Sequence, residues 1–127
     1  MRQEEIAVVL LVERHRGLRG ALASALEQEP DLPVGAQADS LAVVRTVLAL
    51  GGINVAIVSL DLPEGEGFEC VAELANATLP RSISVLALTE SPDPAVYAQA
   101  QEAGASEVLP YSASLEVVIS AIKRISQ

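Results

Sequence analysis

Apolar blocks alternate with amphipathic segments along the whole chain, and this alternation restricts the folds that the chain can adopt. Residues 6–12 form a continuous aliphatic run, which is typical of a strand buried on both faces. Further strand-like runs lie at 33–38, 55–60, 83–88 and 106–109. Helical periodicity follows each of them, with segments expected at 16–29, 41–50, 68–75, 94–103 and 115–125. The pattern therefore predicts strands and helices in strict alternation.

This alternation predicts an α/β fold, because right-handed crossovers make consecutive strands parallel and place helices on both faces of the sheet. The expected architecture is a (βα)₅ flavodoxin-like, doubly wound parallel sheet with strand order 2-1-3-4-5. Ser40 and Ser114 are good helix N-caps, whereas Pro30 and Gly104 close the helices before them. The length suits one continuous core, so residues 1–127 are expected to form a single domain.

Composition argues against several classes of function. The net charge is −9 and the aromatic residues are two tyrosines and one phenylalanine, so this domain is not expected to bind nucleic acid directly. No apolar run approaches the ~18 residues of a membrane span, and two glutamates precede the first strand, so neither a membrane segment nor a signal peptide is expected. Cys70, the single cysteine, is expected to be a small buried side chain. A lone cysteine excludes an internal disulfide and favours a cytoplasmic protein.

The loop SLDLPEGEG, residues 59–67, follows the third strand at the edge where open α/β sheets place their chemistry. A flavodoxin-type cofactor binder would instead need a phosphate loop rich in glycine and hydroxyl groups after the first strand. Here that loop is ERHRG, residues 13–17, which is charged and poor in glycine. We therefore expect no bound cofactor.

Several motifs, in their order and spacing, resemble the receiver domain of bacterial two-component response regulators, and the resemblance covers the whole chain. In that family an aspartate heads the loop after the third strand, with proline four residues later and glycine eight. Ser59 heads this loop, and Pro63 and Gly67 match the other two positions. LALTES resembles the end of the fourth strand, with its hydroxyl at Thr89, and EAGASEVLP resembles the approach to the fifth strand through Gly104. The resemblance implies a receiver fold and a role in signal transduction.

The residues that would carry receiver chemistry are nevertheless replaced. The family's aspartate accepts a phosphoryl group because a carboxylate is nucleophilic at neutral pH, but Ser59 is a hydroxyl with no adjacent base. A pair of acids normally holds Mg²⁺, and here Glu13 is followed by Arg14. Tyr111 stands at the position of the phosphoryl-binding lysine, and the only lysine, Lys123, lies on the last helix. We therefore expect a degenerate phosphorylation site with no metal and no catalytic residue.

Several of these residues admit two interpretations. Ser59 either fills a vacated pocket or is phosphorylated by a serine kinase. Asp61 is a candidate for a displaced phosphoacceptor, although this would shorten the family's loop by two residues. Arg14 is either a solvated surface charge or a guanidinium in the metal position that bridges Glu13 and Asp61. Thr89 is expected to act as a strand-end or N-cap hydroxyl.

Aromatic residues suggest an interaction surface. The family usually signals through the fourth helix, fifth strand and fifth helix, where Tyr97 and Tyr111 lie. Tyr97 is expected to be exposed and to form a protein interface together with Tyr111, which could also cover the site. The alternative is that Tyr97 packs back on the sheet. His15, the only histidine, is expected to be exposed and not catalytic.

The sequence thus predicts an atypical receiver that is not an enzyme and signals without phosphorylation, through a protein partner or a homodimer. The resemblance implies an output domain, often DNA-binding, after the last helix. The alternative is a functional phosphoacceptor that uses Asp61 or Ser59 and is served by a histidine kinase. An enzyme or a nucleotide-binding protein is a third alternative.

Overall fold

The computed structural model describes residues 6–77 and 82–126. Strands and helices alternate along them as predicted, with one additional 3₁₀ turn before the third helix. In chain order the elements are β1 (Val9–Val12), α1 (Arg16–Leu26), β2 (Val34–Ala38), α2 (Leu41–Leu50), β3 (Val55–Ser59), η1 (Pro63–Gly65), α3 (Glu66–Ala75), β4 (Ser84–Thr89), α4 (Pro94–Ala103), β5 (Glu107–Pro110) and α5 (Leu115–Ile125).

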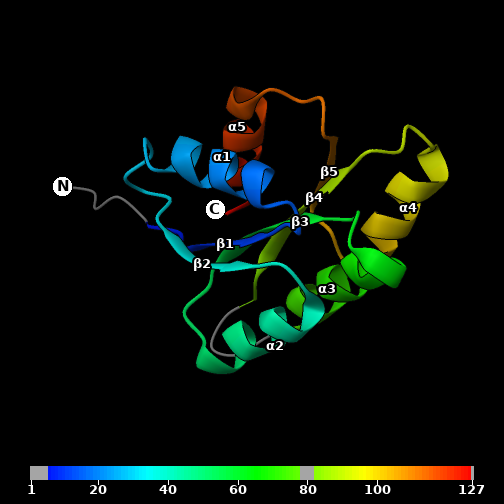
Figure 1. Cartoon of the computed structure of the whole chain (residues 1–127), viewed down its shortest axis with the longest axis horizontal. Helices are drawn as coiled ribbons and strands as arrows, with labels where there is room; N and C mark the ends of the chain where they lie inside the picture. The colour runs from blue at the N-terminus through cyan, green and yellow to red at the C-terminus, as the bar shows by residue number, and fades with distance from the viewer. Residues whose placement is uncertain (1–5, 78–81, 127) are drawn as a thin grey trace.

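The five strands form one parallel sheet in the order β2-β1-β3-β4-β5, which confirms the predicted fold class and strand order. Figure 1 shows α1 and α5 on one face of the sheet and α2, α3 and α4 on the other. Each face has its own apolar cluster, and successive strand residues alternate between them: Leu10 and Val58 face α2 and α3, whereas Leu11 and Ile57 face α1 and α5. The central strands are thus buried on both faces, as their unbroken apolar runs indicated.

Cys70 confirms the prediction of a small buried side chain. It lies on α3 with no exposed surface, and burial raises the pKa of its thiol to about 12. Within the described ranges, no helix is long and apolar enough to cross a membrane.

The predicted start of the first strand was wrong by three residues. β1 begins at Val9, and Ile6 is 62% exposed. The backbone N–H of Val8 donates to Oδ1 of Asn54 at 2.8 Å, so a side chain takes the place of a ladder partner just before the strand.

The predicted end of the first helix was also wrong. α1 ends at Leu26, and the N–H of Glu29 bonds to the carbonyl of Leu26 at 2.9 Å in a tighter turn. Pro30 explains this difference, because a residue before proline disfavours the α conformation.

The third helix begins at Glu66, two residues before the predicted start. Glu64 and Gly65 adopt positive φ angles of 58° and 76°, which turn the chain sharply before the helix. Oε1 of Glu66 accepts the N–H of Leu41 at 3.2 Å, so the first turn of α3 also satisfies a backbone donor at the start of α2. Every other boundary lies within one residue of its prediction.

Candidate functional site

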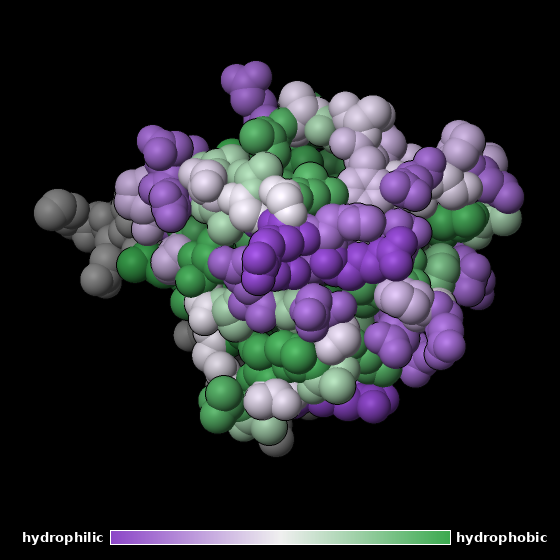
Figure 2. All heavy atoms as spheres, in the orientation of Figure 1, coloured by the Kyte–Doolittle hydropathy of each residue, from purple (hydrophilic) through white to green (hydrophobic). Residues whose placement is uncertain are grey.

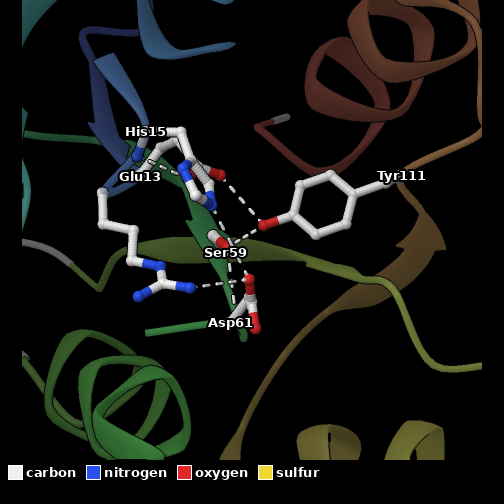
Figure 3. A network of polar contacts seen from close by, with 6 residues as sticks. Glu13, His15, Ser59, Asp61 and Tyr111 are labelled. Carbon is white, nitrogen blue, oxygen red and sulfur yellow. Dashed lines mark hydrogen bonds and ion pairs between the residues drawn. The ribbon is translucent and has the colours of Figure 1, made fainter. Parts of the chain in front are cut away.

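The carboxyl ends of four strands bring the predicted site residues together. Glu13 follows β1, Ser59 ends β3, Thr89 ends β4 and Tyr111 follows β5. Glu13, Ser59 and Thr89 are only 1%, 1% and 3% exposed, and Tyr111 is half-buried. Figure 3 shows the side chains of Glu13, Ser59 and Tyr111 pointing toward one another.

A chain of hydrogen bonds links these residues (Figure 3). The Tyr111 hydroxyl donates to Oε1 of Glu13 at 2.9 Å. Because a phenol carries one proton, the Ser59 hydroxyl is then the donor in its hydrogen bond to Tyr111. Ser59 Oγ also accepts the backbone N–H of Asp61 at 3.2 Å. Each group therefore donates to the next, from the N–H of Asp61 through Ser59 and Tyr111 to the Glu13 carboxylate, and each hydrogen bond polarises the next.

The phenol of Tyr111 is held in its neutral form. Burial is the main cause that raises the pKa of Tyr111 well above its ordinary value, followed by its hydrogen bond to the Glu13 carboxylate. The negative charges of Glu13, Asp61 and Glu90 raise this pKa further, because they disfavour a phenolate. Tyr111 therefore serves as a hydrogen-bond donor to Glu13 and cannot act as a base toward Ser59.

Glu13 receives its hydrogen bonds from within the chain. Oε2 accepts the backbone N–H of His15 at 2.9 Å, while Oε1 accepts Tyr111. The Glu13 carbonyl accepts Nη1 of Arg19 at 2.8 Å, and Nε of Arg19 reaches Gln37 on β2 at 3.2 Å. Among the residues that the structure describes, every buried side-chain nitrogen and oxygen has a hydrogen-bond partner. The carboxylate is thus satisfied although it is almost completely buried.

Asp61 lies at the solvent side of the site, between two basic side chains (Figure 3). Its Oδ2 is 3.6 Å from Nη2 of Arg14 and 3.9 Å from Nε2 of His15. The Arg14 and Asp61 side chains are 43% and 34% exposed. Arg14 was given two interpretations, a solvated surface charge or a bridge between Glu13 and Asp61. It meets Asp61, but the carboxylate oxygens of Glu13 are engaged by Tyr111 and by the backbone of His15.

His15 and Arg19 belong to the surroundings of the site, and the sequence reasoning missed both contributions. The His15 side chain is 56% exposed, as expected, yet its ring approaches Asp61 and its N–H supports Glu13. Their positions in the sequence could have indicated these contacts, because His15 comes two residues after Glu13 and Arg19 lies one helical turn after His15.

Thr89 stands at the end of β4, as the sequence suggested. Its Oγ1 accepts the N–H of Ser91 at 3.0 Å, and its carbonyl accepts the N–H of Tyr111 at 2.9 Å. Thr89 thus supports the turn after β4 and positions the backbone of Tyr111.

Gly67 explains why the loop after β3 needs glycine at this place. A Cβ atom on Gly67 would lie 2.6 Å from Cα of Leu60 and 2.8 Å from its carbonyl oxygen. The first turn of α3 therefore packs directly on the backbone that connects Ser59 to Asp61.

Two other predicted residues lie away from this network. Tyr97 on α4 is half-buried and packs against the cluster beneath α2, α3 and α4, so the expectation of an exposed side chain was wrong. Lys123 pairs with Glu29 at 2.6 Å, where α5 lies beside α1. Tyr111, not lysine, reaches into the site.

The donor set does not suit a divalent cation. Within 6–77 and 82–126, no three side chains of His, Cys, Asp or Glu gather as metal ligands. Mg²⁺ prefers several oxygen ligands in octahedral geometry, but Glu13 is occupied by two donors and Arg14 adds a positive charge beside Asp61.

The sequence profile of the response regulator receiver domain matches residues 9–123. The chain belongs to this family. It is 29% identical over 118 residues to the transcriptional regulatory protein UhpA of Salmonella typhimurium, with 93% of this chain and 58% of UhpA covered. The same figures hold for UhpA of Escherichia coli, so the chain spans less than two thirds of these curated relatives.

Solved structures agree with the fold. The signal receiver domain of the response regulator NarL from Mycobacterium tuberculosis is 20% identical with a TM-score of 0.85, covering 97% of this chain and 98% of that chain. A response regulator from Burkholderia pseudomallei with a phosphorylated aspartic acid and a calcium ion is 21% identical with a TM-score of 0.77, covering 94% and 68%. The chain is thus a receiver domain of a response regulator in two-component signalling.

Proposed function

We propose that this receiver signals without phosphorylation, as a protein-interaction module and not as an enzyme. The observation that carries this proposal is the position of Tyr111. Its hydroxyl lies between Ser59 and Glu13 and bonds to both, which the family resemblance assigns to the positions of the phosphoacceptor and of a metal-binding acid. Both side chains are therefore engaged within the chain and not with a phosphoryl group or a metal.

Ser59 is a poor substitute for the nucleophile. Ser59 is buried, and its oxygen accepts the N–H of Asp61. Its hydroxyl donates a hydrogen bond to the phenol oxygen of Tyr111, and a neutral phenol cannot remove the proton of Ser59. An alcohol requires an adjacent base to react at neutral pH. The geometry supports a structural role for Ser59.

Asp61 carries the second candidate function. Its side chain is 34% exposed and lies 3.6 Å from the guanidinium of Arg14, whose positive charge would favour the approach of an anionic phosphodonor. If Asp61 accepts a phosphoryl group, the receiver is active and a histidine kinase is its partner. Against this candidate, the loop is two residues shorter from Asp61 to Pro63 and Gly67 than the family's pattern requires.

Intact mass after incubation with acetyl phosphate and Mg²⁺ separates these functions. We expect no mass gain, and no saturable shift of the amide resonances of Glu13, Ser59 and Asp61 on Mg²⁺ titration. A phosphoryl adduct that disappears in Asp61→Asn would establish the second function, and one that disappears in Ser59→Ala would identify the serine. Arg45→Lys, which keeps the charge and lies on α2, is the control variant. Its mass should respond to acetyl phosphate as that of the wild type does.

Protein contact is the remaining route for a signal. The relatives are transcriptional regulators longer than this chain, so we propose that the receiver controls an attached output domain or a protein partner in the cytoplasm. The interface role of Tyr97 and Tyr111 stays a prediction. Tyr97→Ala should weaken partner capture while leaving the circular dichroism spectrum unchanged. Unaltered capture would move the interface away from α4.

A further inference from the structure

The connection from β4 to α4 repeats one hydrogen bond three times. Oγ1 of Thr89 accepts the backbone N–H of Ser91 at 3.0 Å, and Oγ of Ser91 accepts the N–H of Asp93 at 3.1 Å. Oδ1 of Asp93 then accepts the N–H of Ala95, in the first turn of α4, at 2.9 Å. Each side chain thus binds the N–H group two residues ahead of it, and we call residues 89–95 the β4–α4 arm.

Two prolines alternate with these residues. Pro92 and Pro94 have no N–H group, so the three bonds above satisfy every backbone donor from 91 to 95. A proline also confines the residue before it to extended conformations, and Asp93 accordingly has φ −69° and ψ 121°. Both the donors and the torsions of the β4–α4 arm are therefore restricted within the arm itself.

Burial does not hold most of the β4–α4 arm in place. Thr89 is 3% exposed and Ser91 is half-buried, but residues 92–95 are exposed. Figure 2 shows hydrophilic to neutral surface over the start of α4, at the right of the view. The path of the arm is thus set by its hydrogen bonds and prolines.

Packing holds α4 less firmly than it holds α3. Ala100 is the one fully buried residue of α4, whereas α3 buries four residues. Val96 and Tyr97 are half-buried against the apolar cluster. Because the free energy of burial grows with apolar area, the orientation of α4 depends more on its connections than that of α3 does.

We propose that the β4–α4 arm is a rigid connection that fixes the orientation of α4 relative to the carboxyl edge of the sheet. At its first residue, the Thr89 side chain is buried at that edge and the Thr89 carbonyl accepts the N–H of Tyr111 at 2.9 Å. At the other end, the side chain of Asp93 caps α4 and its carbonyl accepts the N–H of Val96 at 3.0 Å. The bonds between these ends are continuous.

This inference deepens the proposed function, on which its consequence for signalling rests. Figure 1 shows α4 at the edge of the molecule, joined to β4 by the arm. A helix held in this way keeps one orientation without a phosphoryl group, so a partner that contacts α4 always meets the same surface.

Nuclear magnetic resonance tests the rigidity of the β4–α4 arm. In the wild type we expect the N–H groups of residues 91, 93 and 95 to have order parameters of about 0.85, the value of rigid backbone. Ser91→Ala removes the acceptor of the Asp93 N–H and should speed its hydrogen exchange about tenfold, as the loss of one hydrogen bond predicts. Ser91→Thr keeps the hydroxyl and should exchange like the wild type.

Residual dipolar couplings test the orientation of α4. The double variant Ser91→Ala/Pro92→Ala loses one bond and one restricted torsion, so the couplings of α4 should change while those of α3 stay the same. Ser106→Ala is the matched control, because Ser106 is exposed just beyond the other end of α4. Its couplings should equal those of the wild type.

Order parameters below about 0.6 in the wild-type arm would overturn the proposal. Unchanged exchange of the Asp93 N–H in Ser91→Ala, or unchanged α4 couplings in the double variant, would also overturn it. None of these measurements involves acetyl phosphate, so this inference and the proposed function can fail separately.

Discussion

The carboxyl edge of the sheet and the outer side of α2 differ in the surroundings of their side chains. At the edge, Glu13, Ser59 and Tyr111 bond to one another and to neighbouring backbone. On α2, Val43 and Leu50 place apolar surface in water. Substitutions at the edge should therefore cost folding stability, whereas substitutions of Val43 or Leu50 should leave stability almost unaltered.

Gly67→Ala should have the largest effect on stability. The new Cβ would lie 2.6 Å from the backbone of Leu60, and backbone cannot move aside like a flexible side chain. We expect a loss of about 3 kcal/mol in the free energy of unfolding, measured by urea denaturation. Gly20→Ala is the control: on α1 a Cβ meets nothing within 4 Å, and alanine favours helix, so that variant should gain up to ~1 kcal/mol.

Equal stability of the two alanine variants would contradict this prediction. It would mean that the loop after β3 can move away from α3 at little cost, and that Ser59 and Asp61 are not held in place by the helix.

Tyr111→Phe should have the next largest effect. It removes the donor to Glu13 and the acceptor of Ser59, both of which are buried. We expect a loss of about 1–3 kcal/mol in the same measurement. Tyr97→Phe provides the matched control, because it removes a hydroxyl from a half-buried tyrosine on α4 and should stay within about 0.5 kcal/mol of the wild type.

Leu50→Lys sharpens the comparison between the two regions, since it should also stay within about 0.5 kcal/mol of the wild type. If Leu50→Lys destabilised the protein as much as Tyr111→Phe, the outer side of α2 would be part of the folded core and the contrast would disappear.

The sequence predicted the sheet well because its signals are local. Continuous apolar runs identified β1 and β3, and N-caps identified the starts of α2 and α5, where Ser40 and Ser114 accept the N–H groups of Val43 and Val117 at 3.3 and 3.2 Å. The gathering of Glu13, Ser59, Thr89 and Tyr111 followed from the parallel order alone. Boundaries failed where a side chain replaced a backbone partner, as Asn54 does at β1.

The contacts within the site could not be predicted in the same way. Tyr111 and Glu13 are 98 residues apart, and whether the phenol points into the site or toward a partner depends on side-chain rotamers. The same holds for His15 and Tyr97, whose distances to the site and the core are set by packing. Sequence identified the positions, and tertiary structure decided the partners.

The pH dependence of Tyr111 tests whether its phenol is enclosed. Its pKa is raised above the ordinary value, mainly by burial and then by Glu13. Above pH ~10 the unfolded chain therefore releases this proton while the folded chain keeps it, and stability should fall as the pH rises. In Tyr97→Phe, Tyr111 is the only tyrosine, so absorbance at the phenolate band reports it alone. Titration of the folded variant near pH ~10 would mean that Tyr111 is open to solvent.

Arg14→Ala should have the smallest effect and decides between two interpretations of this arginine. Its guanidinium meets Asp61 at 3.6 Å with both side chains partly exposed, and such ion pairs contribute about 0–1 kcal/mol and weaken with salt. We expect a loss of less than about 0.5 kcal/mol at low salt that disappears at high salt. A double-mutant cycle with Asp61→Ala isolates the pair. A salt-independent loss of about 2 kcal/mol or more would show that Arg14 replaces the metal as an integral part of the site, because only a shielded charge resists screening.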